Sequence, residues 1–242
     1  MKKLSLFMRS LCFYAGYIVV TVILSFASLL LVWLFPDSKR HLFHKLWCSL
    51  MLGWLRFSCG ITYRIEGLDN IPDEPVVVLA NHQSEWETMF VYRHLAPICP
   101  ILKKELLAIP VYGWAMRLVK PIAIDRSKLH EASRSILTQG RDRLEGGRSV
   151  FIFPEGTRAL PGKIKKYSRS GAKLAIAAGV RILPIAHDSG HCWPAHRFLK
   201  LPGTIHVYIG MPLSTRNADS SGLTAQVEQW TRQHIAFSPS EV

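Results

Sequence analysis

An acid–base pair is the first chemistry that the residues suggest. The stretch "NHQSEWET" holds His82 and, five positions later, Glu87, directly after the apolar run 76–80. An imidazole titrates near pH ~6.5 and can accept a proton at neutral pH, and a carboxylate on its far nitrogen fixes the tautomer and stabilises the imidazolium. Residues five apart do not face each other on a helix. The pairing therefore requires His82 in the loop before a helix and Glu87 in its first turn.

The same stretch also fits a purely structural alternative. The run Ser84 to Glu87 reads S-x-x-E, a capping box in which the glutamate accepts a hydrogen bond from the backbone N–H of the serine. Glu85 is a second acid nearby, but it lacks the five-residue spacing from His82. The sequence alone leaves both roles of Glu87 open.

A second polar stretch, "FPEGTR", begins within the apolar run "SVFIF" and extends past its end. Gly156 allows a positive φ or a close approach of the backbone to a ligand, and Arg158 offers a planar fork suited to phosphate. Taken alone, this stretch could also be a plain turn after a strand.

Composition and missing motifs exclude several other kinds of protein. The five cysteines are odd in number and form no C-x-x-C, and no H-E-x-x-H occurs, so we expect neither a disulfide framework nor a metal site. The lack of a G-x-S-x-G elbow argues against a serine hydrolase. The net charge of +13 favours an anionic partner, but no nucleic-acid recognition motif is visible.

The N-terminus predicts a membrane anchor over residues 1–60. No charged residue occurs from Leu11 to Phe35, which is long enough to cross a hydrocarbon core of ~30 Å as a helix. The run is longer than the apolar core of a signal peptide, about 7–15 residues, and it lacks a small-residue cleavage site at its end. Residues 38–60 predict a second helix, interfacial or re-entrant, with apolar residues at helical spacing and several basic residues. Basic residues flank both ends of the first helix, so a single span and a hairpin stay open.

Residues 61–242 predict one α/β domain with a mixed, largely parallel sheet flanked by helices. Apolar stripes at helical spacing occupy 129–144 and 172–178, between short apolar runs that are typical of strands. The expected strands are "TYRIEG", "PVVVLA", "PILKK", "KPIAID", "SVFIF", "RILPIAH" and "TIHVYIG". The polar stretches follow strand ends, where the sites of such sheets form.

Three stretches together are far more specific than each alone. With "LKKELLAIPVYGWAMRLVKPIAIDR" between them, "NHQSEWE" and "FPEGTR" resemble the blocks of the glycerolipid acyltransferases, and among these most closely the lysophosphatidic acid (1-acyl-sn-glycerol-3-phosphate) acyltransferases. The likeness covers about residues 61–212. It implies transfer of an acyl chain from an acyl-CoA or acyl carrier protein thioester to the 2-hydroxyl of a lysophospholipid, without a cofactor, a metal or a covalent enzyme intermediate.

The resemblance also assigns roles to single residues. It implies that His82 is the base and that Glu87 takes the place of the family's usual aspartate, a departure that puts the geometry of the pair in question. The second and third blocks supply the substrate-binding positions, with Arg158 on the phosphate: Lys104, Arg126, Glu155, Gly156, Thr157 and Arg158. Pro184 matches the fourth block.

The expected acceptor is 1-acyl-sn-glycerol 3-phosphate, which would give phosphatidic acid. Another lysolipid acceptor, such as lyso-ornithine lipid, and a non-catalytic membrane lipid-binding protein are the alternatives. The expected partners are the bilayer, lysophosphatidic acid and acyl-CoA or acyl carrier protein, with no nucleic acid. The expected location is the cytoplasmic face of the inner membrane.

Overall fold

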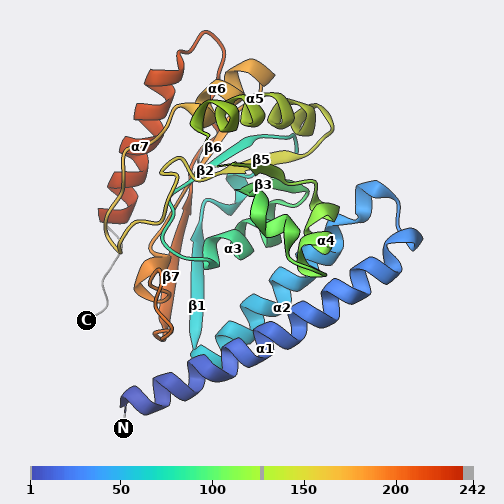
Figure 1. The fold of residues 1–242 in the computed structure, drawn as a ribbon. Coiled ribbons are helices and arrows are strands. Elements are labelled where there is room, and N and C mark those ends of the chain that lie inside the picture. The colour runs from blue at the N-terminus through green and yellow to red at the C-terminus, as the bar shows by residue number, and fades with distance from the viewer. Residues whose placement is uncertain (1, 126–127, 237–242) are drawn as a thin grey trace.

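The computed structural model describes residues 2–125 and 128–236. Within these residues one sheet of seven strands has the order β1–β7–β6–β2–β5–β3–β4 (Figure 1). The strands are β1 Ile61–Glu66, β2 Val77–Ala80, β3 Ile98–Lys103, β4 Ile122–Ile124, β5 Ser149–Ile152, β6 Ile182–His187 and β7 Gly203–Ile209. The helices are α1 Lys2–Leu31, α2 His41–Cys59, α3 Trp86–Leu95, α4 Tyr112–Met116, α5 Leu129–Glu145, α6 Ser170–Ala178 and α7 Ser220–Ala236.

The sheet is parallel except between β6 and β7, which confirms the predicted mixed, largely parallel α/β fold. Each of the seven predicted strands overlaps an observed strand. Strand β2 lies at the centre and every residue in it is buried, as its unbroken apolar run requires of a strand covered on both faces. Because β6, β2, β5, β3 and β4 run in the same direction, their carboxyl ends meet at one edge of the sheet.

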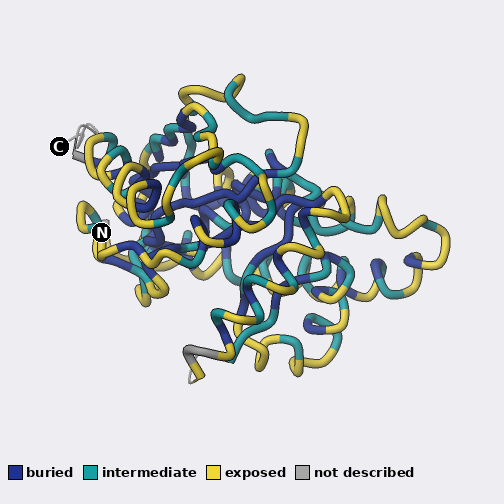
Figure 2. Tube along the Cα trace, turned by 90° about the horizontal axis from the view of Figure 1, so that it is seen from above, coloured by how far each residue is buried: buried dark blue, intermediate teal, exposed yellow. Residues whose placement is uncertain are grey.

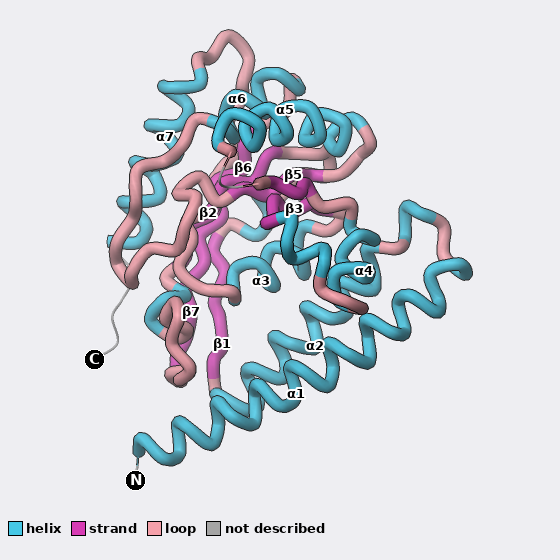
Figure 3. The backbone as a smooth tube through the Cα atoms, viewed as in Figure 1, coloured by secondary structure: helices cyan, strands magenta, loops and turns pink. Residues whose placement is uncertain are grey.

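Helices cover both faces of the sheet (Figures 1 and 3). Helices α1, α2, α3 and α4 pack against one face through an apolar core that includes Phe13, Met51 and Phe90. Helices α5, α6 and α7 pack against the other face through a second core that includes Leu174 and Val227. Seen from above, the strands form the buried interior and the helices expose their outer sides (Figure 2).

The first helix begins earlier and ends earlier than the predicted span from Leu11 to Phe35. It starts at Lys2 and includes Arg9, whose Nε donates to the Ser58 carbonyl near the end of α2 at 2.9 Å. It ends at Leu31, where a turn of 3₁₀ helix follows. The second predicted helix is observed as α2 and ends at Gly60, whose φ of 68° provides the left-handed C-cap.

Helix α1 is the one segment of the described chain that is long and apolar enough to cross a membrane. Only 17% of its most apolar window is buried inside the protein, so most of its apolar surface is exposed. The indole Nε1 atoms of Trp54 and Trp47 bond α1 at the Phe13 carbonyl (3.1 Å) and the Thr21 hydroxyl (3.0 Å), so α1 and α2 form a bonded pair.

A buried lysine joins α1 to the rest of the protein. Lys200 is 0% exposed, and its Nζ donates to the Tyr14 hydroxyl at 2.7 Å and to the carbonyls of Arg197 and Phe198 at 2.9 and 3.0 Å. The same ammonium lies 4.8 Å from the ring centroid of Tyr14 and 4.7 Å from that of Trp193. Two carbonyls, a hydroxyl and two aromatic faces thus replace the water that this charge loses.

We predict that Lys200→Met lowers the stability of the whole chain. The apolar side chain fills a similar volume but leaves the two carbonyls and the tyrosine hydroxyl without their donor, which costs about 1–3 kcal/mol. Thermal unfolding in detergent measures the change. Lys163→Met, at an exposed lysine, is the control and should melt like the wild type. Equal melting of all three proteins would show that Lys200 does not join α1 to the sheet.

Candidate active site

The loop that carries His82 is fixed at the end of β2 by a paired side chain. The Asn81 amide donates to the His187 carbonyl at 2.9 Å and accepts from the His187 N–H at 3.0 Å. The His187 ring, in turn, contacts the Asn81 carbonyl through Nε2 at 2.8 Å. The ends of β2 and β6 are therefore locked together one residue before His82.

The structure brings the predicted acid–base pair together. His82 Nδ1 lies 2.8 Å from Glu87 Oε1, because His82 stands in the loop and Glu87 is the second residue of α3. The glutamate is 0% exposed, and the imidazole side chain is 11% exposed. With Nδ1 directed at the carboxylate, Nε2 is the ring nitrogen that can meet a substrate. The extra methylene of glutamate therefore does not prevent the contact.

Glu87 also performs the structural role, so the two alternatives are combined in one side chain. The backbone N–H groups of Gln83 and Ser84 donate to its Oε1 at 3.0 and 2.9 Å. The Ser84 hydroxyl contacts Oε2, and the Ser189 hydroxyl donates to Oε2 at 3.0 Å. Burial by itself would raise the pKa of Glu87, but the neighbouring imidazoles and hydrogen bonds outweigh it and lower the pKa to about 2.

Ser189 was not predicted from the sequence. It begins the short 3₁₀ helix after β6 and is fully buried, with its hydroxyl 2.8 Å from that of Ser84. The next residue, Gly190, donates its N–H to the Gln83 side chain at 3.0 Å. Ser189 lies just after the strand "RILPIAH", at the sheet edge where the other polar stretches lie, and this position is the signal that could have identified it.

The loop "FPEGTR" lies directly against the His82 loop. Glu155 accepts from the His82 N–H at 2.9 Å with one oxygen and from the Lys165 N–H at 3.0 Å with the other, while the Ala159 N–H donates to the His82 carbonyl at 2.7 Å. Burial raises the pKa of Glu155. Its carboxylate thus joins two loops. Gly156 has a φ of 70° with open space where a Cβ would lie, so the backbone conformation is what requires glycine there.

Phe153, from the same loop, stacks on His82. The ring centroids are 3.8 Å apart and the planes differ by 14°. The phenyl ring covers one face of the imidazole and, with the bond to Glu87, fixes its orientation. Sequence reasoning did not single out this residue.

Arg158 faces the beginning of α3. One of its terminal nitrogens lies 3.2 Å from Glu85 Oε1, and Thr157 beside it is exposed. The Arg158 Nε is buried and has no hydrogen-bond partner among the described residues. An unpaired guanidinium N–H of this kind is costly and would be satisfied by a phosphate oxygen.

The second block lies farther along the same edge of the sheet. Lys104 follows β3, two strands from β2, and its exposed ammonium contacts Asp125 Oδ2 at 2.6 Å. Within the described residues no hydrogen bond or ion pair joins Lys104 to His82 or Arg158. Arg126 lies outside the described residues. No group of three or more potential metal ligands occurs among the residues that the structure describes.

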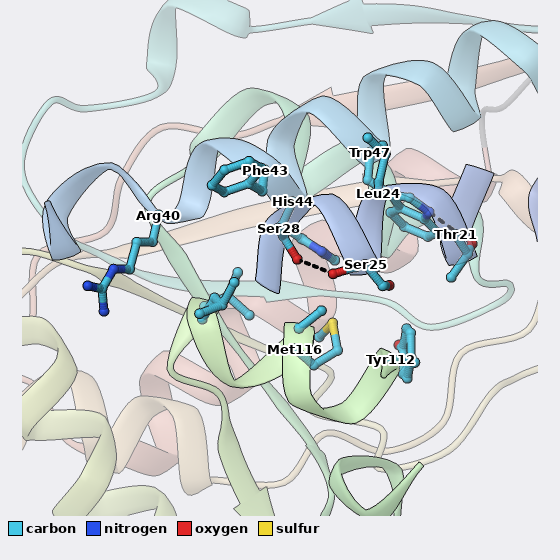
Figure 4. A pocket seen from close by; sticks show the side chains of 13 residues that line it. Thr21, Leu24, Ser25, Ser28, Arg40, Phe43, His44, Trp47, Tyr112 and Met116 are labelled. Carbon is cyan, nitrogen blue, oxygen red and sulfur yellow. Dashed lines mark hydrogen bonds between the residues drawn. The ribbon is translucent and has the colours of Figure 1, made fainter. Parts of the chain in front are cut away.

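A small cavity lies between α1, α2 and α4 (Figure 4). Two of its hydroxyl groups form hydrogen bonds: Ser28 donates to the Ser25 carbonyl at 2.8 Å, and Thr21 accepts from the Trp47 indole. Its volume of about 40 Å³ has room for a few water molecules.

Comparisons with known proteins identify the family of this chain. The chain matches the Acyltransferase family over residues 62–188, which includes the His82 loop, the "FPEGTR" loop and β6. It is 43% identical over 196 residues to the 1-acyl-sn-glycerol-3-phosphate acyltransferase of Pseudomonas aeruginosa, covering 78% of this chain and 75% of that protein. It is 28% identical over 224 residues to 1-acyl-sn-glycerol-3-phosphate acyltransferase alpha of Homo sapiens, covering 90% of this chain and 76% of that protein.

The fold has a close counterpart as well. The crystal structure of the 1-acyl-sn-glycerophosphate (LPA) acyltransferase PlsC from Thermotoga maritima matches with a TM-score of 0.83 and 26% identity, covering 98% of this chain and 97% of that one. The match includes the helices that precede the sheet, and it confirms the family resemblance read from the three blocks. By its sequence match, its relatives and its fold, this chain belongs to the acyltransferase family.

Proposed function

We propose that the protein transfers an acyl chain from an acyl thioester to the 2-hydroxyl of 1-acyl-sn-glycerol 3-phosphate, forming phosphatidic acid. The observation that carries the proposal is the His82–Glu87 contact of 2.8 Å, placed beside the loop that holds Arg158. The names of the relatives support the acceptor. The reaction would belong to phospholipid synthesis at a membrane.

In this reaction His82 acts as the general base. Its Nε2 takes the proton of the acceptor hydroxyl while the oxygen attacks the thioester carbonyl. The tetrahedral intermediate then expels the thiolate, which receives the proton back from the imidazolium. Glu87 stabilises the imidazolium from the Nδ1 side, and with a pKa of about 2 it is ionised at any pH where the enzyme works. An enzyme-bound acyl group is not needed.

Arg158 is the proposed contact for the acceptor phosphate. Its unpaired Nε and its planar fork suit a phosphate oxygen, and Glu85 holds the guanidinium beside the start of α3 until the acceptor arrives. Lys104, Arg126 and Thr157 are proposed to complete the acceptor site, since the family resemblance places them there. Gly156 and Glu155 shape the loop that carries Arg158.

The N-terminal helices are proposed to hold the enzyme on a membrane, with residues 1–60 as anchor and 61–242 as the acyltransferase domain. The exposed apolar surface of α1 supports this role. Because α1 packs along α2, and α2 packs on α3, a lipid-embedded α1 brings the active-site helix close to the lipid surface where a single-chain lysolipid resides. The proposed location is the cytoplasmic face of the inner membrane.

We predict that His82→Ala abolishes acyl transfer from an acyl thioester to lysophosphatidic acid. Activity is lost because no other base among the described residues forms a hydrogen bond with Glu87. Product formation by purified protein in detergent measures it. The variant must have the same melting temperature and the same membrane binding as the wild type, so that the loss of activity is not a loss of folding. Turnover within threefold of the wild type would refute the mechanism, whereas lysolipid binding without any turnover by the wild type would show a non-catalytic lipid-binding role.

We predict that Glu87→Gln lowers kcat strongly and leaves the KM of the acceptor almost unchanged. The amide keeps the shape but removes the charge that stabilises the imidazolium, so the loss falls on the transition state. A bond to an ionised partner contributes about 1.5–3 kcal/mol, or roughly ten- to a hundredfold in rate. Steady-state kinetics measure kcat and KM, and Glu66→Gln, at an exposed glutamate, is the control. A change in KM alone would assign Glu87 to substrate binding.

Glu87 also predicts how stability depends on pH. Its pKa falls from an ordinary 4.5 to about 2 on folding, so its contribution to stability is fully present above 4.5 and is lost as the pH falls toward 2. Between pH 4.5 and 2 we expect the free energy of unfolding of the wild type to decrease more steeply than that of Glu87→Gln. Parallel curves for the two proteins would contradict the tightly hydrogen-bonded carboxylate.

Arg158→Ala is predicted to raise the KM for lysophosphatidic acid by roughly ten- to a hundredfold, as expected for one charge-assisted contact of about 1.5–3 kcal/mol. Arg158→Lys should recover only part, because an ammonium lacks the two-pronged fork. Lyso-ornithine lipid, which has no phosphate, should be a poor acceptor for the wild type and the variant alike. If the substitution slows both acceptors equally, Arg158 supports the loop and does not bind the phosphate. Arg216→Ala, at an exposed arginine, is the control.

A further inference from the structure

A second and much larger cavity opens at the carboxyl edge of the sheet, on the face covered by α5 and α6. Its volume is about 680 Å³, within the range of about 300–1,000 Å³ that is usual for ligand sites. Its floor is apolar and comes from strands β3, β4 and β5 and helix α5: Ile101, Ile124, Ile152 and Ile136. Such a floor accommodates the uncharged part of a ligand.

The rim of this cavity is basic. Lys166, Arg169 and Lys173 line it and are exposed, and the hydroxyls of Ser168 and Ser170 lie 3.0 Å apart between them. The three rim residues come from a segment, 156–187, that contains lysine and arginine but no aspartate or glutamate. None of the three forms an ion pair within the described residues, although Glu155 also lines the cavity and the carboxylate of Glu228 lies near Lys166. An apolar floor with a cationic rim fits an anion that carries a long, uncharged arm.

The wall of the cavity is shared with the active site. Phe153, Glu155 and Gly156 line the cavity, and the same loop stacks a ring on His82 and accepts the His82 N–H. A ligand that lies along the cavity therefore ends at the loop that contacts the catalytic base. The cavity is separate from the Arg158 side of the loop, where the acceptor phosphate is proposed to bind.

The position of the rim excludes the lipid surface as the source of the anion. Helices α1 and α2 pack on one face of the sheet, and α5 and α6 pack on the other (Figure 1). If α1 and α2 lie in the bilayer, the rim formed by Lys166, Arg169 and Lys173 faces the water. The anion that it binds must then be dissolved, whereas the acceptor lysolipid comes from the membrane.

Resting on the proposed function, we propose that this cavity is the site of the acyl donor and binds its phosphopantetheine arm. The phosphate lies on the rim of Lys166, Arg169 and Lys173, the pantetheine chain lies over the isoleucine floor, and the thioester end reaches the Phe153–Gly156 wall beside His82. Acyl-CoA and acyl carrier protein both carry this arm. Donor and acceptor thus reach one histidine from opposite faces of the sheet.

The test compares two charge-reversal variants with the same change in net charge. Lys166→Glu/Lys173→Glu acts on the rim, and Arg169 is left because it forms the N-cap of α6. Arg64→Glu/Arg216→Glu acts on exposed arginines elsewhere and is the control. Each protein is assayed with lysophosphatidic acid and, in separate arms, with acyl-CoA and with acyl carrier protein thioester. Binding of coenzyme A without an acyl group is measured by calorimetry as a readout that does not depend on turnover.

We expect the rim variant to raise the donor KM by about tenfold or more at low salt, with the acceptor KM unchanged, and the difference to shrink as ionic strength screens the charges. An increase in both arms identifies the shared phosphopantetheine as the bound group, and an increase with one donor identifies the source that the rim serves. Donor KM values equal to those of the control in both arms would overturn the proposal while leaving the proposed reaction intact. A raised acceptor KM or weakened vesicle binding would also overturn it, because the rim would then face lipid. Failure of the wild type to acylate lysophosphatidic acid with either donor refutes the proposed function itself.

Discussion

A carboxylate removed from water must be surrounded by donors, and this requirement governs the arrangement around Glu87. Backbone N–H groups from the loop before α3, the hydroxyls of Ser84 and Ser189 and the ring of His82 all converge on two oxygens. They can converge only because β2 and β6 are neighbours that run in the same direction, so that their following loops meet at one edge. The parallel centre of the sheet is therefore a condition for the acid–base pair as well as a consequence of the apolar pattern.

Much of this arrangement could be predicted from the sequence because its signals are local. Each strand is a short apolar run, and His82 and Glu87 are close enough in the chain for spacing to indicate a contact. The contacts of Ser189, the stacking of Phe153 and the bond from Glu155 to the His82 backbone join segments far apart in sequence. Nothing in the local pattern specifies such pairs, since they depend on the order of strands in the sheet. The cavity between β3, β4, β5 and α5 could not be predicted from the sequence for the same reason.

The two polar stretches also differ from their simplest readings in an informative way. Glu155 belongs to a motif that the resemblance assigns to the substrate, yet both of its oxygens bond backbone N–H groups. Glu85, which lacked the motif spacing, instead contacts the arginine proposed to bind phosphate. An acid within a sequence motif can thus act by holding a loop, and an acid outside the motif spacing can hold a cation in place. In both cases the geometry assigns a role that residue type alone leaves open.

The hydroxyl of Ser189 has a consequence for how this enzyme can vary. A glutamate has one more rotatable bond than an aspartate, and its terminal torsion is broad. Four of the five groups that hold Glu87 come from residues 82–84, and the fifth, the Ser189 hydroxyl, comes from another segment. Together with the Ser84 hydroxyl it holds Oε2, so that Oε1 faces the histidine. The acid at position 87 and the hydroxyl at position 189 are therefore coupled in their effects, a case of epistasis between residues of different loops. We therefore expect the effect of exchanging this glutamate for aspartate to depend on the residue at position 189, because one of the two side chains that hold its outer oxygen lies beyond the motif.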